Sequence, residues 1–472
     1  MDSSRSVCRF VLSALGVFAV ASHLLAADGE KHSLVSERQA GSLTRVDIAL
    51  QVGGDLKLVT EGKPRNLPMS VVANVKYDEH LLTVDAENQP RRAIRYYDDA
   101  RAVIKVEQGG EKPAISEARR LVVAEKPVKA AAVLFCPTGG LSREELDLID
   151  VPANSLVIDR LLPGKSVALG ESWKQTDQTL ADLLGLEAVS WSDVQSLLNH
   201  VADGLAEITT SGSVSGAIGG VSTEIEIKAK YRFDLTAKRI TYLAMLIKEK
   251  RAVGLIGPGL DTTAKLIVKI NDLKESERLT PEVLRKAREL TPEVSQLIYT
   301  SRGGHFRFLY DRRWFLTSDD SKLAVFRLLD RGELVAQCNI SAVPADSSQG
   351  VNLAEFQKDV QSSLGKNFGQ FINASQSTSD AGYKILRVVV HGNVSKLPIE
   401  WVYYLIADDH GQRVSMAFTL EESLVDRFAQ ADRALVNAVQ LPLAGKPTAA
   451  KAPNAKTSTA KATSPKATKT NK

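Results

Sequence analysis

The sequence predicts an α+β protein with two antiparallel sheets, the first larger and with few helices. Three observations lead to this prediction. From residue 41 to 272, apolar and polar residues alternate with a period of two, as in strands that bury one face. Residues 273–302 carry helix-start signals, and residues 303–443 mix strand and helix patterns. Aromatic residues make up only 6% of the chain, so we expect aliphatic cores.

Residues 1–27 have the pattern of a secretory signal peptide. Arg5 and Arg9 precede the apolar stretch Phe10–Ala21, and small residues follow it as far as Ala27. We expect cleavage between Ala21 and Ala27 and a mature protein that is secreted or periplasmic. An uncleaved membrane anchor is the alternative, although a membrane-spanning helix needs about 20 apolar residues.

The segment 28–40 is polar, and we expect it to be loose. The β-rich domain, residues 41–272, follows. Its clearest strand is Thr223–Asp234, where five apolar residues alternate with charged ones. Asp203-Gly204 is typical of a tight hairpin turn. Two short helices are expected near Ser142–Ile149, with Ser142 as N-cap, and near Thr179–Leu186.

Residues 273–302 predict a helical linker. The sequence Leu-Thr-Pro-Glu-Val occurs at 279–283 and again at 290–294. Thr before Pro-Glu favours a helix start, because Thr caps and Pro suits the first helical position. We expect two short helices, or one helix broken at Pro292, followed by a hinge at Gly303-Gly304.

The second domain, residues 303–443, is predicted to contain strands, a helix, further strands and a closing helix. Three strands precede a helix at Leu353–Phe368, whose apolar residues recur at helical spacing. Three more strands lie between Tyr383 and Leu420, and a long helix covers about Glu421–Gln440. This order favours an antiparallel sheet with helices packed on it.

This second domain resembles the PsbP-like α/β/α sandwich. The likeness covers about 140 residues and depends on element order, with Phe306-Arg307-Phe308 and Trp314 near its start and the long helix at its end. The fold is shared by PsbP, the Ran-binding protein Mog and secreted actinobacterial lipoproteins, and the resemblance implies a non-enzymatic, partner-binding module. The stretch from Leu162 to Trp173 resembles a segment of uncharacterised secreted β-rich bacterial proteins and implies no activity.

The segment 444–472 is a lysine-rich tail that we expect to be disordered. It consists of small and polar residues with no apolar side chain larger than Ala, so it cannot bury enough surface to fold. Its cations are the candidate contacts for an anionic partner: Lys446, Lys451, Lys456, Lys461, Lys466, Lys469 and Lys472. The formal net charge of +4 therefore conceals a body, residues 28–445, of about −4.

Three cysteines are present, and Cys8 lies within the predicted signal peptide. Cys136 and Cys338 are about 200 residues apart and fall in different predicted domains. We expect two buried, unpaired thiols, although a disulfide would be possible in an oxidising compartment.

No motif in the sequence predicts catalytic, cofactor-binding or metal-binding residues. Gly164-Lys165-Ser166 lacks the preceding glycine and following helix of a phosphate loop. The segment Gly212–Gly216 has Val at the centre, where a nucleophile elbow needs Ser. For Asp408-Asp409-His410, turn chemistry is favoured over weak binding of a cation. Asp98-Asp99 and Asp319-Asp320 are adjacent residues, which do not face each other across a cleft.

These observations lead to an exported, non-enzymatic binding or structural protein of the cell envelope. Its partner is unknown; an anionic envelope polymer or another envelope protein, bound through the tail or the PsbP-like domain, fits best. Nucleic acid is disfavoured, because the tail has no aromatic residues for stacking and export removes the chain from the cytoplasm. Two alternatives stay open: a carrier of a hydrophobic ligand, and a hydrolase without a recognisable motif.

Overall fold

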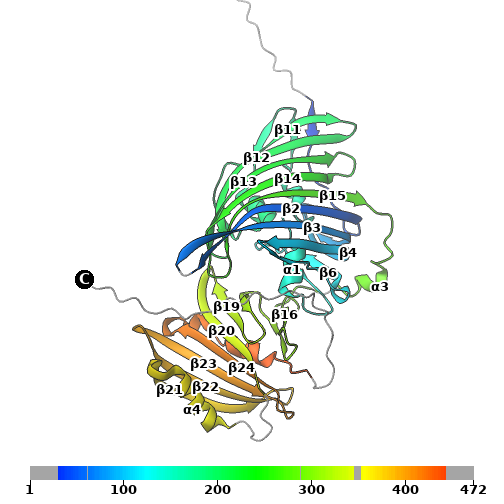
Figure 1. Cartoon of the computed structure of the whole chain (residues 1–472). Coiled ribbons are helices and arrows are strands. Elements are labelled where there is room, and N and C mark those ends of the chain that lie inside the picture. The colour runs from blue at the N-terminus through cyan, green and yellow to red at the C-terminus, as the bar shows by residue number, and fades with distance from the viewer. Residues whose placement is uncertain (1–29, 61, 288, 345–351, 443–472) are drawn as a thin grey trace, which may run out of the picture.

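The computed structural model describes residues 30–60, 62–287, 289–344 and 352–442. They form two large antiparallel sheets, two small two-stranded sheets and short helices (Figure 1). The structure is mainly β with some helix, which confirms the predicted α+β class. The predicted signal peptide and the seven tail lysines lie outside the described residues.

The large sheet has thirteen strands and is antiparallel throughout. Its order is β7-β6-β4-β3-β2-β15-β14-β13-β12-β11-β9, with β5 on β4 and β10 on β12. Strand β2 pairs with β15, so that Val46 lies opposite Ile270 in the middle of the sheet. The strands are β2 (Leu43–Thr60), β3 (Lys63–Val84), β4 (Pro90–Val106), β5 (Gly109–Glu111), β6 (Leu121–Glu125), β7 (Val133–Phe135), β9 (Ser172–Lys174), β10 (Ala188–Ser192), β11 (Gln195–Ala202), β12 (Leu205–Ile218), β13 (Val221–Asp234), β14 (Arg239–Arg251) and β15 (Gly259–Asp272).

One face of this sheet is covered by the chain between β7 and β10. That segment contains α1 (Arg143–Ile149), the 3-10 helix η2 (Ile158–Leu161) and α2 (Asp177–Leu184). Their apolar side chains join those of the sheet in one buried core that is mainly aliphatic but also holds aromatic residues such as Tyr77, Tyr231 and Phe233. We call this covered side the inner face and the opposite side the outer face. The outer face carries the polar residues of each alternating strand, as the period of two predicts.

The residues after 29 differ from the predicted loose segment. Strand β1 (Lys31–Ser33) pairs with β8 (Ser166–Ala168), and Leu34 is completely buried. Arg38 is also buried, and its guanidinium lies 3.1 Å from the carboxylate of Asp159. This polar segment is held in place because its few inward-facing side chains have partners in the core.

The region predicted as a helical linker contains less helix than expected. Helix α3 (Pro281–Leu284) forms at the first Leu-Thr-Pro-Glu-Val, with Thr280 as its N-cap. The second copy forms only a turn, closed by the amide of Val294 on the Thr291 hydroxyl at 3.4 Å. The chain then enters β16 (Leu297–Thr300), which pairs with β17 (Arg307–Tyr310) in a small sheet.

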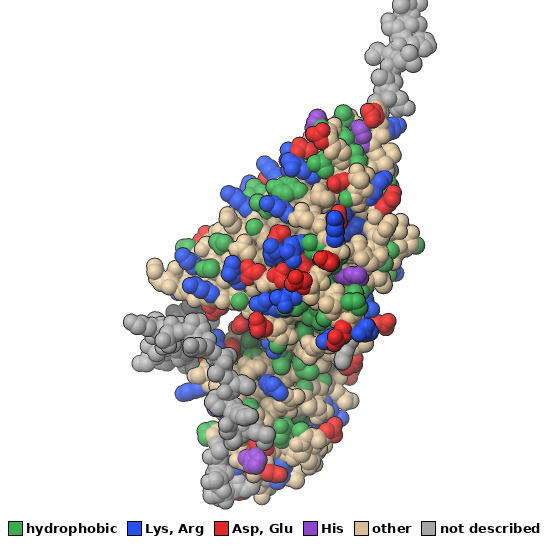
Figure 2. Space-filling model, turned by 90° about the vertical axis from the view of Figure 1, so that its right-hand side faces the viewer, with side chains coloured by type: hydrophobic (Ala, Val, Ile, Leu, Met, Phe, Trp, Pro, Cys, Tyr) green, Lys and Arg blue, Asp and Glu red, His purple; other side chains and the backbone are tan. Residues whose placement is uncertain are grey.

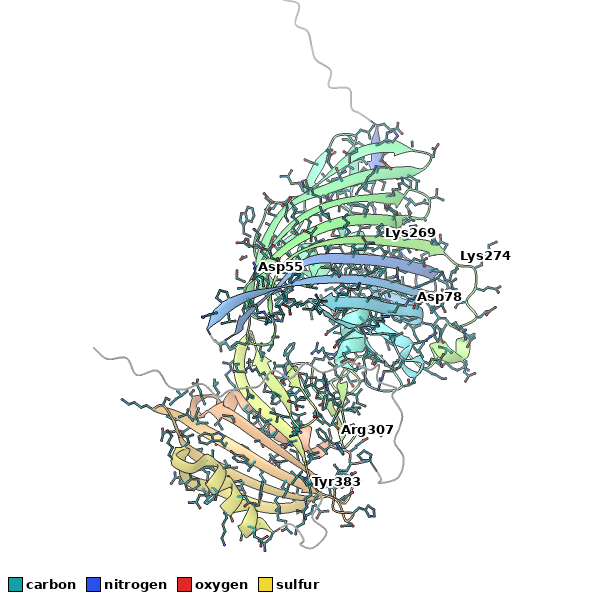
Figure 3. All side chains as sticks on the ribbon, in the orientation of Figure 1. Asp55, Asp78, Lys269, Lys274, Arg307 and Tyr383 are labelled. Atoms are coloured by element: carbon teal, nitrogen blue, oxygen red, sulfur yellow. The ribbon has the colours of Figure 1, made fainter. Side chains whose placement is uncertain are left out.

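The second large sheet has seven strands in the order β18-β19-β20-β24-β23-β22-β21. Helix α4 (Leu353–Leu364) packs on one face, and α5 (Val425–Phe428) and α6 (Ala431–Asn437) pack on the other. The last described residues are anchored to the domain through Gln440, which pairs with Arg307, and Leu441, whose amide donates to Tyr383 (Figure 3). The strands are β18 (Trp314–Asp319), β19 (Ala324–Asp330), β20 (Glu333–Val343), β21 (Phe368–Thr378), β22 (Lys384–Val394), β23 (Leu397–Ala407) and β24 (Arg413–Glu421).

Two features of this domain differ from the sequence prediction. Strand β21 follows α4 and is absent from the predicted order. The closing helix is not continuous over Glu421–Gln440: a 3-10 turn at 422–424 and α5 are separated from α6 by Ala429 and Gln430, both with positive φ. The chain changes direction there, which lets Phe428 pack against Phe418.

The two domains share one continuous hydrophobic core. Arg312, in the turn before β18, donates to the carbonyl oxygens of Leu134 and Ser295 at 2.5 and 2.6 Å. The β12–β13 turn touches the β19–β20 turn, where a Cβ on Gly220 would lie 2.4 Å from the Cα of Gly332. Arg327 of β19 also donates to the carbonyl of Leu255 in the β14–β15 loop. The domains therefore form a close-packed unit.

Candidate functional site

A cavity of about 340 Å³ lies where the two domains meet. Helix α1, the β12–β13 turn and the β14–β15 loop wall it on one side, and β18 closes the other. Ligand sites occur preferentially at such interfaces, with a mainly apolar lining and a few polar groups. The apolar lining residues include Ile218, Val221, Ile256, Pro258, Phe315 and Leu316.

Both arginines that line this interdomain cleft are already engaged. The Arg143 guanidinium lies 5.0 Å from the centre of the Phe315 ring and donates to the carbonyl of Arg312 at 3.2 Å. Arg251 is paired with Glu249 through two of its nitrogen atoms. An arginine that is held in this way forms part of the cleft wall and has fewer free hydrogen-bond donors for an incoming anion.

The two acids in the cleft are less fully engaged. Asp147 has Arg143 at 3.8 Å, and the Glu187 carboxylate accepts one hydrogen bond, from the Gly220 amide at 3.1 Å. The Asp147 side chain is 64% exposed, but protein surrounds it because it lies in a concavity. That partial burial, with Asp150 and Glu144 adding to it and Arg143 opposing, raises the pKa of Asp147 to about 6. The cleft therefore combines apolar walls with carboxylates available to a ligand.

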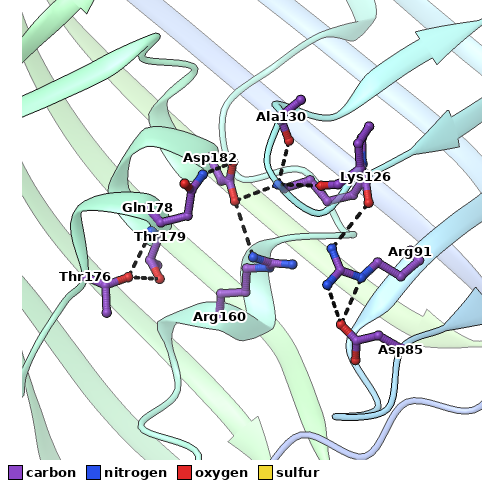
Figure 4. Close-up of polar contacts among 10 residues, drawn as sticks. Asp85, Arg91, Lys126, Ala130, Arg160, Thr176, Gln178, Thr179 and Asp182 are labelled. Carbon is purple, nitrogen blue, oxygen red and sulfur yellow. Dashed lines mark hydrogen bonds and ion pairs between the residues drawn. The ribbon is translucent and has the colours of Figure 1, made fainter.

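A second, more polar cavity of about 470 Å³ lies beside α2. Charged groups that line this cavity, or lie next to it, form ion pairs with one another (Figure 4). The Asp182 carboxylate lies 3.1 Å from Lys126 Nζ and 3.4 Å from Arg160 Nη1, and Arg91 is 2.7 Å from Asp85. Lys126 also donates to the carbonyl of Ala130 at 2.6 Å. These contacts join the β3–β4 turn, the loop after β6, η2 and α2, so we interpret this network as structural.

The motifs weighed in the sequence all lie in turns or strands with local partners. Gly164 has a positive φ in the turn before β8, and the segment 212–216 lies inside β12. The Asp408 carboxylate accepts amides of its own turn, as does that of Asp320. Arginines pair with Asp98, Asp99 and Asp319. None of these residues lines the interdomain cleft.

Cys136 and Cys338 are both buried and unpaired, which confirms the expectation of free thiols. Burial raises the pKa of the Cys338 thiol well above its usual range. Across the described ranges, no group of three His, Cys, Asp or Glu side chains is placed to hold a metal ion. In the same part of the chain, no helix is long and apolar enough to cross a membrane.

No protein-family model matches the chain, and no curated protein matches it. Solved structures with some similarity include the cyanobacterial PsbP of Synechocystis sp. PCC 6803, at 15% identity, covering 31% of this chain and 92% of that one, with a TM-score of 0.26. The Ran-binding protein Mog1p of Saccharomyces cerevisiae has 10% identity, covers 31% and 95%, and has the same TM-score of 0.26. The translocator domain of NalP from Neisseria meningitidis has 6% identity, covers 81% and 88%, and has a TM-score of 0.13. At these scores the similarities establish neither a family nor a function.

Sequence reasoning did not find the interdomain cleft. Its lining comes from residues as distant as Arg143 and Leu316, and no local motif connects them. Gly219-Gly220 and the glycines at 254 and 257 lie in connections between strands, and their position beside β18 depends on how the two sheets pack. The nearest signal in the sequence is the concentration of Gly and Pro in the β12–β13 turn and the β14–β15 loop.

Proposed function

We propose that this chain is an exported, non-enzymatic binding protein of the cell envelope, and that its ligand occupies the interdomain cleft. The observation that carries the proposal is the cleft itself, which has apolar walls from both domains and two carboxylates at its surface. The signal-peptide pattern of residues 1–27 supports export. The cleft has acids but no nucleophile–base pair among its lining residues, which favours binding over catalysis.

We further propose that the C-terminal domain is PsbP-like. Its support is the element order, with three strands, α4, four strands and closing helices, and the packing of helices on both faces of the seven-stranded sheet. In this proposal the domain supplies one wall of the cleft through Phe315 and Leu316.

The alternative of a hydrophobic-ligand carrier needs a free aliphatic surface. The inner face of the large sheet is aliphatic, but Leu146, Ile158 and Leu180 belong to the same buried core and cover it. A lipid on this face would have to displace α1, η2 and α2. The interdomain cleft is the better site, because it is already open.

The test compares the full chain purified from cells with a variant in which the cleft is filled. Ala252 lies exposed at the rim of the cleft, so Ala252→Trp adds bulk there without entering the core. Ala131→Trp, in an exposed loop that does not line the cleft, is the matched control. We expect native mass spectrometry and co-purification to find a bound molecule or partner on the wild type and the control, and not on Ala252→Trp.

The same samples test export. We expect the chain in the extracytoplasmic fraction, with an N-terminus between residues 22 and 28. A cytoplasmic chain that keeps residues 1–27 would contradict export. Wild-type protein with no bound molecule or partner, or binding that Ala252→Trp leaves unchanged, would contradict the cleft as the ligand site.

A further inference from the structure

The outer face of the large sheet contains three continuous rows of neighbouring side chains that cross seven strands from β12 to β4. The strand registers place these residues side by side. At about 4.8 Å between strands, each row is about 29 Å long. The rows are Thr209–Lys230–Ala244–Ile267–Ala49–Asn74–Arg101, Ser211–Lys228–Leu246–Lys265–Gln51–Val72–Val103 and Ser213–Glu226–Lys248–Thr263–Gly53–Ser70–Lys105.

These rows concentrate positive charge on a protein whose body is acidic. They contain six basic side chains and one acidic one, Glu226, whereas residues 28–445 carry about −4 in total. Figure 2 shows Lys and Arg side chains gathered along the upper left margin of the molecule. We call the six basic residues the basic band: Arg101, Lys105, Lys228, Lys230, Lys248 and Lys265.

The cations of the basic band are available to a partner. The side chains of Lys228, Lys230 and Lys248 are 66%, 53% and 51% exposed, and their pairs with Glu226 or Glu207 are surface contacts, as is the pair of Arg101 with Asp99. Such pairs contribute at most about 1 kcal/mol, so a polyanion can replace them. No ion pair is recorded for Lys265 among the described residues, and it lies exposed in the middle row.

The uncharged residues between these cations indicate which polyanion fits. Hydroxyl and amide side chains occur in every row and can hydrogen-bond sugar hydroxyls. None of the 21 residues in the rows, all of them described, is aromatic, so the rows themselves offer no stacking platform of the kind that single-stranded nucleic acids use. The cations are mostly Lys, which suits dispersed carboxylates better than planar bidentate recognition. Those hydrogen-bonding residues are Thr209, Asn74, Ser211, Gln51, Ser213, Thr263 and Ser70.

From this arrangement we infer that the outer face of the large sheet is a binding surface for a linear acidic polysaccharide, which lies across the strands along the basic band. This surface shares no residue with the interdomain cleft or with the lysine tail. A flexible chain of carboxylated sugars can follow a curved sheet, and its repeating charges meet the cations of neighbouring rows. The interaction is electrostatic and therefore weakens as salt rises.

The test measures binding of the full chain to alginate, a linear polymer of uronic acids, in low and physiological salt. The band variant is Lys228→Glu/Lys230→Glu/Lys265→Glu. The matched control, Lys274→Glu/Lys286→Glu/Lys366→Glu, changes the net charge equally at exposed lysines outside the rows. We expect the band variant to weaken binding by about tenfold or more, and the control by less than about threefold. Circular dichroism verifies the fold of each variant. If charge reversal perturbs the fold, Lys→Gln at the same three band positions takes its place, and we expect a smaller loss of alginate binding.

A third variant, with Lys→Gln at all seven tail lysines, separates the band from the tail. We expect it to keep most of the alginate affinity. The inference is overturned if the tail variant loses binding while the band variant keeps it, if both charge-reversal triples weaken binding equally, or if no chain binds alginate. Tighter binding to oligo-dT or to phosphatidylglycerol vesicles than to alginate also overturns the choice of partner. Because Ala252→Trp leaves the outer face unchanged, failure of the cleft proposal leaves this result unaffected.

Discussion

Asp147 shows how a cleft affects a single carboxylate. Its folded pKa of about 6 is above the ordinary value of 3.8, so the folded state binds the proton more strongly than the unfolded state. The free energy of unfolding therefore falls as the pH rises from about 4 to about 6, and the loss persists at neutral pH. A group that destabilises the protein in this way is expected at a site for a ligand, because a bound cation would relieve the cost.

We expect Asp147→Asn to raise the free energy of unfolding at pH 7.5 by about 1 kcal/mol, after allowance for solvent screening of an exposed carboxylate. At pH 3.5 most of the gain should disappear, because Asp147 is then protonated in the folded state and mostly protonated in the unfolded state. Urea unfolding at the two pH values measures this. Asp380→Asn, at an exposed turn outside the cleft, is the control for the substitution itself. Equal stabilisation by Asp147→Asn at both pH values would contradict the assignment.

Lys126 and Asp182 form a buried pair with side-chain exposures of 0% and 2%. We expect Asp182→Asn to lower the free energy of unfolding by about 3 kcal/mol, because it leaves the Lys126 ammonium buried without its counter-ion. The double variant Lys126→Met/Asp182→Asn should recover part of this loss, since it removes the fully buried ammonium and leaves only the partly exposed Arg160 guanidinium without its partner. Thermal and urea unfolding measure both variants. A double variant less stable than Asp182→Asn would show that packing, rather than charge, dominates at this position.

At the scale of elements, helix α1 depends on a capping box. The amide of Glu145 donates to the Ser142 hydroxyl at 3.1 Å, and the amide of Ser142 donates to the Glu145 carboxylate at 3.0 Å. We expect Ser142→Ala to cost about 1 kcal/mol of stability. Ser190→Ala, whose hydroxyl is exposed on β10, should cost less than half as much. Because α1 carries Arg143 and Asp147, the variant should also weaken ligand retention in the cleft, and native mass spectrometry measures this.

Elements with strong local signals could be predicted from the sequence. Asp203 and Gly204 both take the positive φ that a two-residue hairpin needs, and Ser142 caps α1 as expected. Strand β21 could not be predicted, because its register shifts between Phe368 and Gln370 and again between Phe371 and Asn373, which removes the alternation. The closing helix was predicted as continuous because apolar residues keep helical spacing across Ala429 and Gln430. The backbone at these two residues is not helical, because both have a positive φ.

For the whole molecule, one of the contacts that pack the two domains together is a close approach of two glycines. A Cβ on Gly332 would lie 2.5 Å from the Cα of Gly220, and Gly332 also has a positive φ of 79°. We expect Gly332→Ala to destabilise the protein by about 1–3 kcal/mol and to increase protease cleavage between the domains. Gly257→Ala, where nothing lies within 4 Å of the added Cβ, is the control. Unchanged stability and cleavage of Gly332→Ala would show that the domain contact adjusts freely.

The candidate site belongs to this scale, which explains why the sequence did not reveal it. Periodicity predicts which face of each strand is buried, and the predicted outer positions of β13 agree with the structure. Neither the cleft nor the basic band is a property of one strand. The cleft requires the position of β18 relative to α1, and the band requires the register of seven strands at once.

The pairing of β2 with β15 has a consequence for how the chain reaches this structure. Thr44 lies opposite Asp272, so more than 200 further residues must be synthesised before β2 can pair with β15. Until then β2, β3 and β4 form an open meander with an unpaired edge, a template for aggregation. Because the N-terminus is synthesised first, this edge stays unpaired until β15 follows. Folding should therefore be slow, and refolding yields should improve when a holding chaperone covers the strands until β15 arrives.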